Sequence, residues 1–179
     1  VIKKTSIFRN IFIQSFANCF TISVGNSGQR RNSAHNYSKS NTYDADAQKI
    51  NPSEKEVSAS TAGAPARDAF DGNEDTRWCA TSDALSQWLM IDLQETYNLE
   101  AVYVFFEQKS DWNYKIETSL DNIEWSEYAP ADTQRIIDVT VNKQAQARYI
   151  RLTVESTTDG AWASVWEMEV YVNKDTPKP

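Results

Sequence analysis

The sequence has few of the residues from which most catalytic centres are built. Among its 179 residues are one histidine, His35, and two cysteines, Cys19 and Cys79. It contains no glycine-rich phosphate loop, no G-x-S-x-G nucleophile motif and no cysteine and histidine pair. These absences argue against catalysis by the nucleophilic, nucleotide-dependent and histidine–metal mechanisms that such motifs support.

Long apolar runs are also missing. Residues 11–24 are weakly apolar and follow three basic residues, in the manner of a degenerate signal peptide, but they are too short and too polar to span a membrane. Residues 26–56 consist mainly of small polar and charged residues. Because such a segment cannot bury enough apolar surface to fold, we interpret residues 1–25 as a possible leader and residues 26–56 as a disordered linker.

Charge is unevenly divided along the chain. Residues 1–56 carry eight lysines and arginines against four acidic residues, whereas residues 57–179 carry ten against 21, a net charge of −11. This negative charge opposes binding of the second part to nucleic acid or to an anionic membrane surface.

Short segments rich in β-branched and aromatic residues begin at residue 57 and are separated by turns. The segments are 88–93, 99–106, 114–119, 136–141, 147–154 and 165–172. A turn at residues 120–123 contains Asn122, which tolerates a left-handed backbone. Although five glycines and five prolines are few for such a protein, the pattern predicts an all-β sandwich over residues 57–173, followed by a tail at 174–179.

One turn carries four oxygen-bearing side chains within six positions. Asp71, Asn73, Asp75 and Thr76 lie around Gly72, which permits a tight backbone. Hard oxygen ligands in a short loop suit Ca²⁺, although the residue order does not match that of an EF-hand loop. On these residues alone, a calcium loop and an ordinary solvated turn both remain open.

Five sequence blocks occur in an informative order. They read A-F-D-G-N-x-x-T-R-W-C-A, Q-W-L-x-I-D-L, Y-K-I-E-T-S-x-D-N-x-x-W, A-R-Y-I-R-L and W-A-S-V-W-E-M-E-V-Y. Together they resemble the coagulation-factor type C, or discoidin-like, domain, and within it the family 32 carbohydrate-binding modules of bacterial glycoside hydrolases. The resemblance covers residues 57–173 and implies an eight-stranded jelly-roll sandwich of the galactose-binding-domain-like class.

The resemblance implies a structural Ca²⁺ ion between the aspartate–glycine turn and the last strand. Its ligands would be the side chains of Asp71, Thr76 and Glu167 and the backbone carbonyls of Asp68, Asn73, Thr76 and Trp166. Two carboxylates with several neutral oxygens suit Ca²⁺ better than Mg²⁺. Cys79 has no disulfide partner within the domain, so we expect a buried thiol that packs as a small apolar side chain.

For sugar binding, the resemblance implies three loops at one end of the sandwich, namely 81–86, 107–113 and 157–162. A pyranose lays its C–H face on an aromatic ring and offers hydroxyl groups to polar side chains. Trp162 occupies the position of the family's stacking aromatic. The further ligand-binding candidates are Glu107, Trp112, Asn113 and Asp83.

The chain departs from the galactose-binding members of the family. Those members have a histidine in the first loop and an arginine in the second, whereas this chain has no histidine there and has Glu107 near the expected arginine. The resemblance therefore does not extend to galactose specificity. The four tryptophans inside strand-like blocks are predicted to pack in the core, and they are Trp78, Trp88, Trp125 and Trp166.

These observations lead to one expectation and two alternatives. We expect a non-catalytic, Ca²⁺-stabilised bacterial module, secreted, periplasmic or on the cell surface, that tethers a glycoside hydrolase or a cell to a glycan, as a monomer or as part of a multidomain enzyme. A discoidin-type adhesion domain with a protein partner is the first alternative, and the negative charge disfavours a phospholipid partner. Glycosidase activity from carboxylates such as Glu107 and Asp111 is the second, and sequence gives no measure of their separation.

Overall fold

The computed structural model describes residues 47–84, 86–157 and 160–173, so the predicted leader, most of the predicted linker and the tail lie outside the described residues. The described elements are β1 (Ala47–Lys49), η1 (Pro52–Glu54), β2 (Glu56–Ala59), η2 (Ala66–Ala69), β3 (Trp78–Cys79), β4 (Gln87–Ser119), β5 (Ser126–Thr157) and β6 (Ser164–Asn173). The predicted all-β class is confirmed. Within these ranges, neither short 3-10 helix is long or apolar enough to cross a membrane.

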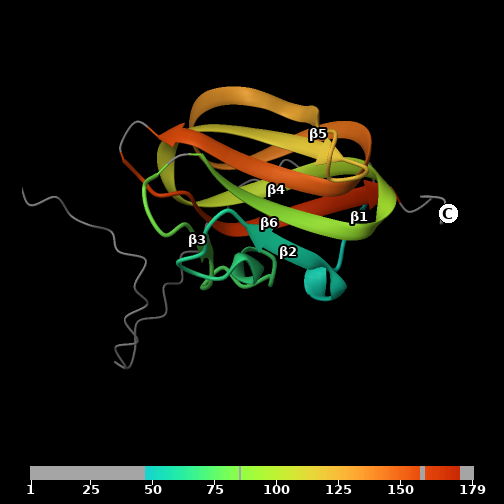
Figure 1. Cartoon of the computed structure of the whole chain (residues 1–179), viewed down its shortest axis with the longest axis horizontal. Helices are drawn as coiled ribbons and strands as arrows, with labels where there is room; N and C mark the ends of the chain where they lie inside the picture. Colours follow the sequence, from blue (N-terminus) through green and yellow to red (C-terminus); the bar gives the residue numbers. More distant parts are fainter. Residues whose placement is uncertain (1–46, 85, 158–159, 174–179) are drawn as a thin grey trace, which may run out of the picture.

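The pairing register distributes β4 and β5 over two layers (Figure 1). In the first layer, residues 149–154 of β5 lie between residues 87–92 and residues 113–119 of β4, and β2 pairs with β4 at the edge. In the second layer, residues 101–105 of β4 lie between β6 and residues 138–142 of β5, and β1 pairs with the other side of β6. Several strands predicted as separate are thus segments of two long, bent strands.

Local backbone chemistry accounts for the bends and turns. Gln94 has a φ of +66°, and its N–H donates to the Asp92 carboxylate at 2.6 Å, where the register of β4 shifts between the two layers. The turn between β4 and β5 has Asn122 at a φ of +64°, as predicted. Asparagine is among the few non-glycine residues that adopt this conformation readily.

Residues 47–56 correct the predicted extent of the linker, because they are structured. β1 pairs antiparallel with β6, the N–H of Ile50 donates to the carbonyl of Val170 at 2.9 Å, and Lys49 forms a 2.7 Å ion pair with Glu169. The linker prediction rested on local composition. Composition does not reveal that a polar segment can complete the edge of a sheet formed by residues more than 100 positions away.

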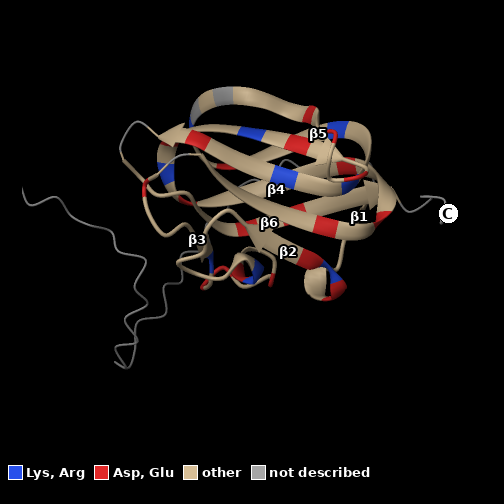
Figure 2. Ribbon diagram, in the orientation of Figure 1, with Lys and Arg blue, Asp and Glu red and all other residues tan. Residues whose placement is uncertain are grey.

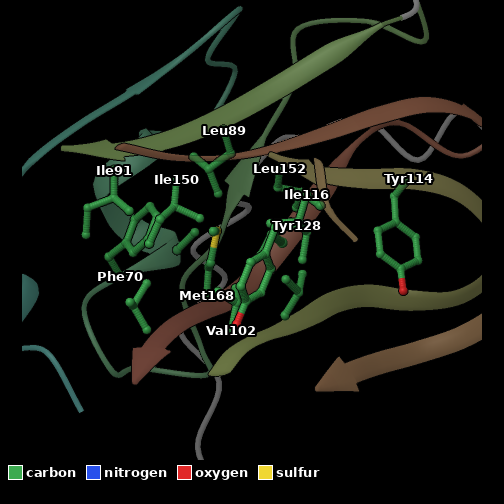
Figure 3. Close-up of a cluster of buried hydrophobic side chains, with 14 of the residues drawn as sticks. Phe70, Leu89, Ile91, Val102, Tyr114, Ile116, Tyr128, Ile150, Leu152 and Met168 are labelled. Atoms are coloured by element: carbon green, nitrogen blue, oxygen red, sulfur yellow. The ribbon is translucent and has the colours of Figure 1, made fainter. Parts of the chain in front are cut away.

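The core lies between the two layers. Alternate residues of each strand point inward, so Leu89 and Ile91 from β4 meet Ile150 and Leu152 from β5, as Figure 3 shows. Met168 of β6 reaches the same cluster from the second layer. The Cys79 thiol is buried as predicted, at the end of β3.

Strand alternation also corrects the prediction for the tryptophans. Trp78 is fully buried, as predicted, but Trp88, Trp125 and Trp166 are partly exposed. Trp88 points outward because its neighbours in β4 fill the core, and the Trp125 ring lies 3.9 Å from the guanidinium of Arg151. Acidic and basic residues are interspersed along these outer surfaces (Figure 2). The sequence blocks located the strands correctly but did not show which face each indole takes.

Candidate functional site

The described parts of the three segments predicted to bind a sugar lie at one end of the sandwich, and the second of them, residues 107–113, is part of β4 and not a loop. Ala80, just before the first loop, donates its N–H to the carbonyl of Ala163, just after the third, at 2.9 Å. Thr157, at the start of the third loop, pairs with Trp112 in the second. The sheet register therefore brings together three segments that are far apart in the sequence.

Trp162 lies two residues before β6 begins, and its side chain is partly exposed. Because Val165 of β6 pairs with Phe106 of β4, the loop carrying Trp162 leaves the sheet beside Glu107, which is also partly exposed. The other predicted contacts with side chains at least partly exposed are Asn113 and Asp83. These positions leave all four side chains accessible, and their contact with a sugar stays a prediction.

Trp112 does not belong to a ligand site, and its prediction is wrong. Its side chain is 0 % exposed, and its ring stacks on Phe106 with centroids 4.8 Å apart and an interplanar angle of 14°. The indole N–H donates to the carbonyl of Gln108 at 3.1 Å. The Trp112 ring is therefore packed against the core, and its indole N–H has a hydrogen-bond acceptor inside the protein. The polar residues around Trp112 suggested a loop, but β4 continues through this position and turns the indole inward.

Arg77 is the residue at this end of the sandwich that sequence reasoning missed. Its Nε atom lies 3.1 Å from a Glu107 carboxylate oxygen, and its guanidinium lies 5.2 Å from the centroid of the Trp166 ring. The Trp166 indole N–H donates to the carbonyl of Glu107 at 3.1 Å. The sequence did contain one signal for this position. Side chains alternate between the two faces of a strand, so a residue next to the buried Trp78 is expected to point to the outer face.

The aspartate–glycine turn is held together by its own hydrogen bonds. The two carboxylate oxygens of Asp71 accept from the N–H of Asn73 at 2.8 Å and from the hydroxyl of Thr76 at 2.7 Å. Gly72 has a φ of +75°, which side-chain-bearing residues rarely adopt. Burial, followed by the charge of Asp71, raises the pKa of Asp68 just before the turn. The predicted turn ligands thus occupy one compact loop.

Glu167 of β6 meets this turn. Its side chain is buried, with 5 % exposed, and its Oε1 atom has no hydrogen-bond partner among the described residues. The backbone N–H of Gly72 lies near enough to the same carboxylate to oppose the rise in its pKa. Burial, and after it the charge of Asp71, raises the pKa of Glu167 to about 7. The structure therefore places Glu167 near Asp71, which is 96 positions earlier in the chain, and their role as metal ligands stays a prediction.

This arrangement fits a bound cation. A buried carboxylate oxygen without a partner, beside a second carboxylate, is costly unless positive charge compensates it. The nearby Lys49 is already paired with Glu169. Within the described ranges, no three acidic, histidine or cysteine side chains converge as a metal-binding group. An ion at Asp71 and Glu167 would therefore depend on the Thr76 hydroxyl and on backbone carbonyls for its remaining oxygens.

A cavity of about 400 Å³ lies beside the two carboxylates. Phe70, Ile91 and Met168 line it with apolar surface, and residues 49–53 line it from the N-terminal side. Its lining includes Arg67, whose guanidinium donates to the carbonyl of Pro52 at 2.6 Å. The cavity is therefore continuous with the Asp71 and Glu167 cluster and is separate from the loop end.

The described geometry agrees with a family model. The F5/8 type C domain model matches residues 49–168. Like the structured region, this match begins before residue 57, the start of the sandwich predicted from the sequence. No curated protein matches the chain.

Solved structures give the same fold. A family 32 carbohydrate-binding module from Clostridium perfringens NanJ, solved with galactose, is 25 % identical; the match covers 70 % of this chain and 98 % of that one, with a TM-score of 0.61. Chitosan-binding module 1 of a chitosanase/glucanase from Paenibacillus sp. IK-5 is 26 % identical over 65 % of this chain and 94 % of that one, with a TM-score of 0.60. Chitosan-binding module 2 of the same enzyme, solved with chitotriose, is 26 % identical over 65 % and 95 %, with a TM-score of 0.59.

Proposed function

Because the chain belongs to the F5/8 type C domain family, we propose that it is a non-catalytic carbohydrate-binding module that holds a glycan at its loop end. The observation that carries this proposal is the partly exposed indole of Trp162, in a loop that leaves the sheet beside the partly exposed carboxylate of Glu107. An accessible indole offers a flat apolar surface to the C–H face of a sugar ring. An accessible carboxylate on the neighbouring strand accepts hydrogen bonds from hydroxyl groups.

The sugars bound by similar structures support a glycan as the ligand. The NanJ module was solved with galactose and the second Paenibacillus module with chitotriose. A secreted or surface-attached module of this kind would keep an attached hydrolase, or the cell that carries it, near the glycan by raising the effective concentration of one at the other. Weak binding at one site suffices for this role.

A bound Ca²⁺ ion is the second part of the proposal. The side chains of Asp71, Thr76 and Glu167 would hold it, with the backbone carbonyls of Asp68, Asn73, Thr76 and Trp166. The unpartnered Oε1 atom of Glu167 beside Asp71 supports this assignment. When bound, the ion would neutralise the two carboxylates. The chain's own residues would then tie the turn after η2 to β6, which also carries Trp166.

The experiment is a glycan-array screen of the full chain in calcium buffer, comparing wild type with Trp162→Ala. We expect wild type to bind a defined sugar class and Trp162→Ala to lose that signal while keeping the wild-type circular dichroism spectrum. Trp125→Ala is the matched control, because Trp125 is also a partly exposed tryptophan but lies near the turn at the opposite end. An empty array for folded wild type, or equal losses in both variants, would refute the loop-end assignment.

A further inference from the structure

Arg77, Trp166 and Glu107 form one group on the outer face of the second layer, at the loop end. Their position follows from the register: Val165 pairs with Trp78 on one side and with Phe106 on the other. Val165, Trp78 and Phe106 are fully buried. Because successive residues of a strand point to opposite faces, the residue before Trp78 and the residues after Val165 and Phe106 point outward, and these are Arg77, Trp166 and Glu107.

The group is held by three different contacts. Arg77 Nε lies 3.1 Å from the Glu107 carboxylate, its guanidinium lies over the Trp166 ring at 5.2 Å, and the Trp166 indole N–H donates to the Glu107 carbonyl at 3.1 Å. Arg77 thus constrains the Glu107 side chain, and Trp166 constrains its backbone. The side chain of Glu107 nevertheless remains 33 % exposed. The result is an accessible acceptor whose range of orientations is restricted before any ligand arrives.

We propose that Arg77 is a positioning residue of the glycan site: it orients the Glu107 carboxylate to accept a hydroxyl hydrogen bond from a sugar stacked on Trp162. This inference rests on the proposed function. Fixing an acceptor in advance removes part of the entropy that a free glutamate side chain loses on binding. Arg77 acts through Glu107 and need not touch the sugar.

The contact geometry favours this role over a purely structural ion pair. The Nε atom of Arg77 lies 3.1 Å from the Glu107 carboxylate, and this buried atom is within ion-pair distance without making a well-aligned hydrogen bond. By contrast, Arg148 grips Asp92 with two parallel hydrogen bonds of 2.9 Å. A poorly aligned contact adds little stability but still limits where a carboxylate can point.

The test is a concentration series of the full chain on the glycan array, with wild type, Arg77→Gln, Glu107→Gln and the double variant. We expect Glu107→Gln to weaken binding by about tenfold, the size of one lost charge-assisted hydrogen bond. Arg77→Gln leaves the Glu107 carboxylate in place but less constrained, so it should weaken binding measurably and by no more than Glu107→Gln does. The double variant should be no weaker than Glu107→Gln, because Arg77 acts through Glu107. Arg148→Gln is the matched control, since it removes an arginine from a carboxylate pair at the other end, and it should leave binding unchanged.

The outcomes separate this inference from the proposed function. If wild type binds no glycan, the proposed function fails and this inference fails with it. If wild type binds and Arg77→Gln binds equally well, only the positioning role fails. Losses that multiply in the double variant would also overturn it. If Arg77→Gln does not fold, Arg77→Lys replaces it: this variant keeps the charge but loses the planar fork, and we expect its affinity to fall between those of wild type and Glu107→Gln.

Discussion

The two ends of the sandwich each hold an arginine, a carboxylate and an aromatic ring, but the two groups are built differently. At the far end, Arg148 makes two 2.9 Å hydrogen bonds to Asp92 and lies 4.8 Å from the Tyr149 ring centroid. At the loop end, Arg77 Nε lies 3.1 Å from the Glu107 carboxylate without a well-aligned hydrogen bond, beside Trp166. Similar residues thus form a doubly hydrogen-bonded ion pair at the far end and a less well-aligned, partly exposed ion pair at the loop end.

The two arginine–carboxylate pairs differ in what they contribute, because one is arranged for stability and the other leaves its carboxylate available to a ligand. The hydrogen bonds from Arg148 hold the pKa of Asp92 below its usual value, so its charge favours the folded state. A carboxylate whose oxygens are both gripped by one guanidinium has little capacity left for a ligand. The Glu107 side chain is one-third exposed and Arg77 Nε makes no well-aligned hydrogen bond to its carboxylate, so the carboxylate retains acceptor capacity. We therefore expect substitutions in the Arg148–Asp92 pair to change stability and substitutions in the Arg77–Glu107 pair to change binding, whereas buried residues affect stability at either end.

The largest expected effect tests this division inside the loop end itself. Trp112→Ala should lower the free energy of unfolding by about 3–5 kcal/mol, because it removes a fully buried indole and leaves a cavity against Phe106. Urea denaturation measures the loss. Trp162→Ala is the comparison, and it should cost less than about 1 kcal/mol because its ring is partly exposed. Equal costs for the two substitutions would show that Trp162 is a core residue and would end the case for it as a sugar platform.

The next effect in size comes from removing calcium. If the ion binds the folded state only, chelation should lower the free energy of unfolding by roughly 2.7 kcal/mol relative to calcium at 100 times its Kd. Thermal unfolding with calcium and with excess EDTA measures this change. Binding at the loop end should weaken as well, since Arg77 directly follows Thr76 and Trp166 directly precedes Glu167.

Glu167→Gln is the control for the chelation experiment. It removes one anionic ligand while keeping the size and most of the shape of the side chain, so its melting temperature should respond less to EDTA than that of wild type. Identical wild-type melting curves in calcium and in EDTA would exclude a stabilising ion at Asp71 and Glu167.

The sequence predicted the strands and the meeting of Asp71 with Glu167, because both rest on local patterns and on a family resemblance that covers most of the chain. It placed Trp78 in the core correctly, but it was wrong about the direction of Trp112 and of the three partly exposed strand tryptophans, Trp88, Trp125 and Trp166. Trp112 and Trp162 both lie among polar residues, and only the continuation of β4 through Trp112 distinguishes them. Arg77 was missed for a related reason: its importance comes from β6, which lies between β3 and β4 and is about 90 residues later in the chain.

The smallest effect concerns the far end. Asp92→Asn should lower the free energy of unfolding by about 1 kcal/mol near pH 7, because it replaces a charge-assisted pair that is partly open to solvent. The pKa of Asp92 is lowered in the folded state, so the stability from its charge is present above its unfolded value of 3.8 and is lost as the pH falls through the folded pKa. Urea denaturation of both proteins near pH 7 and below pH 3 measures the difference, which should shrink in acid.

Glycan binding by Asp92→Asn decides whether the two ends are independent. The two arginine–carboxylate pairs share no residue, and effects at well-separated sites usually add without interaction. Asp92→Asn should therefore bind the array as wild type does at neutral pH, while Glu107→Gln should bind weakly and unfold at nearly the wild-type urea concentration. If Asp92→Asn lost binding in proportion to its lost stability, the loop end would depend on the rigidity of the whole sandwich, and Glu107 would owe its orientation to more than Arg77 and Trp166.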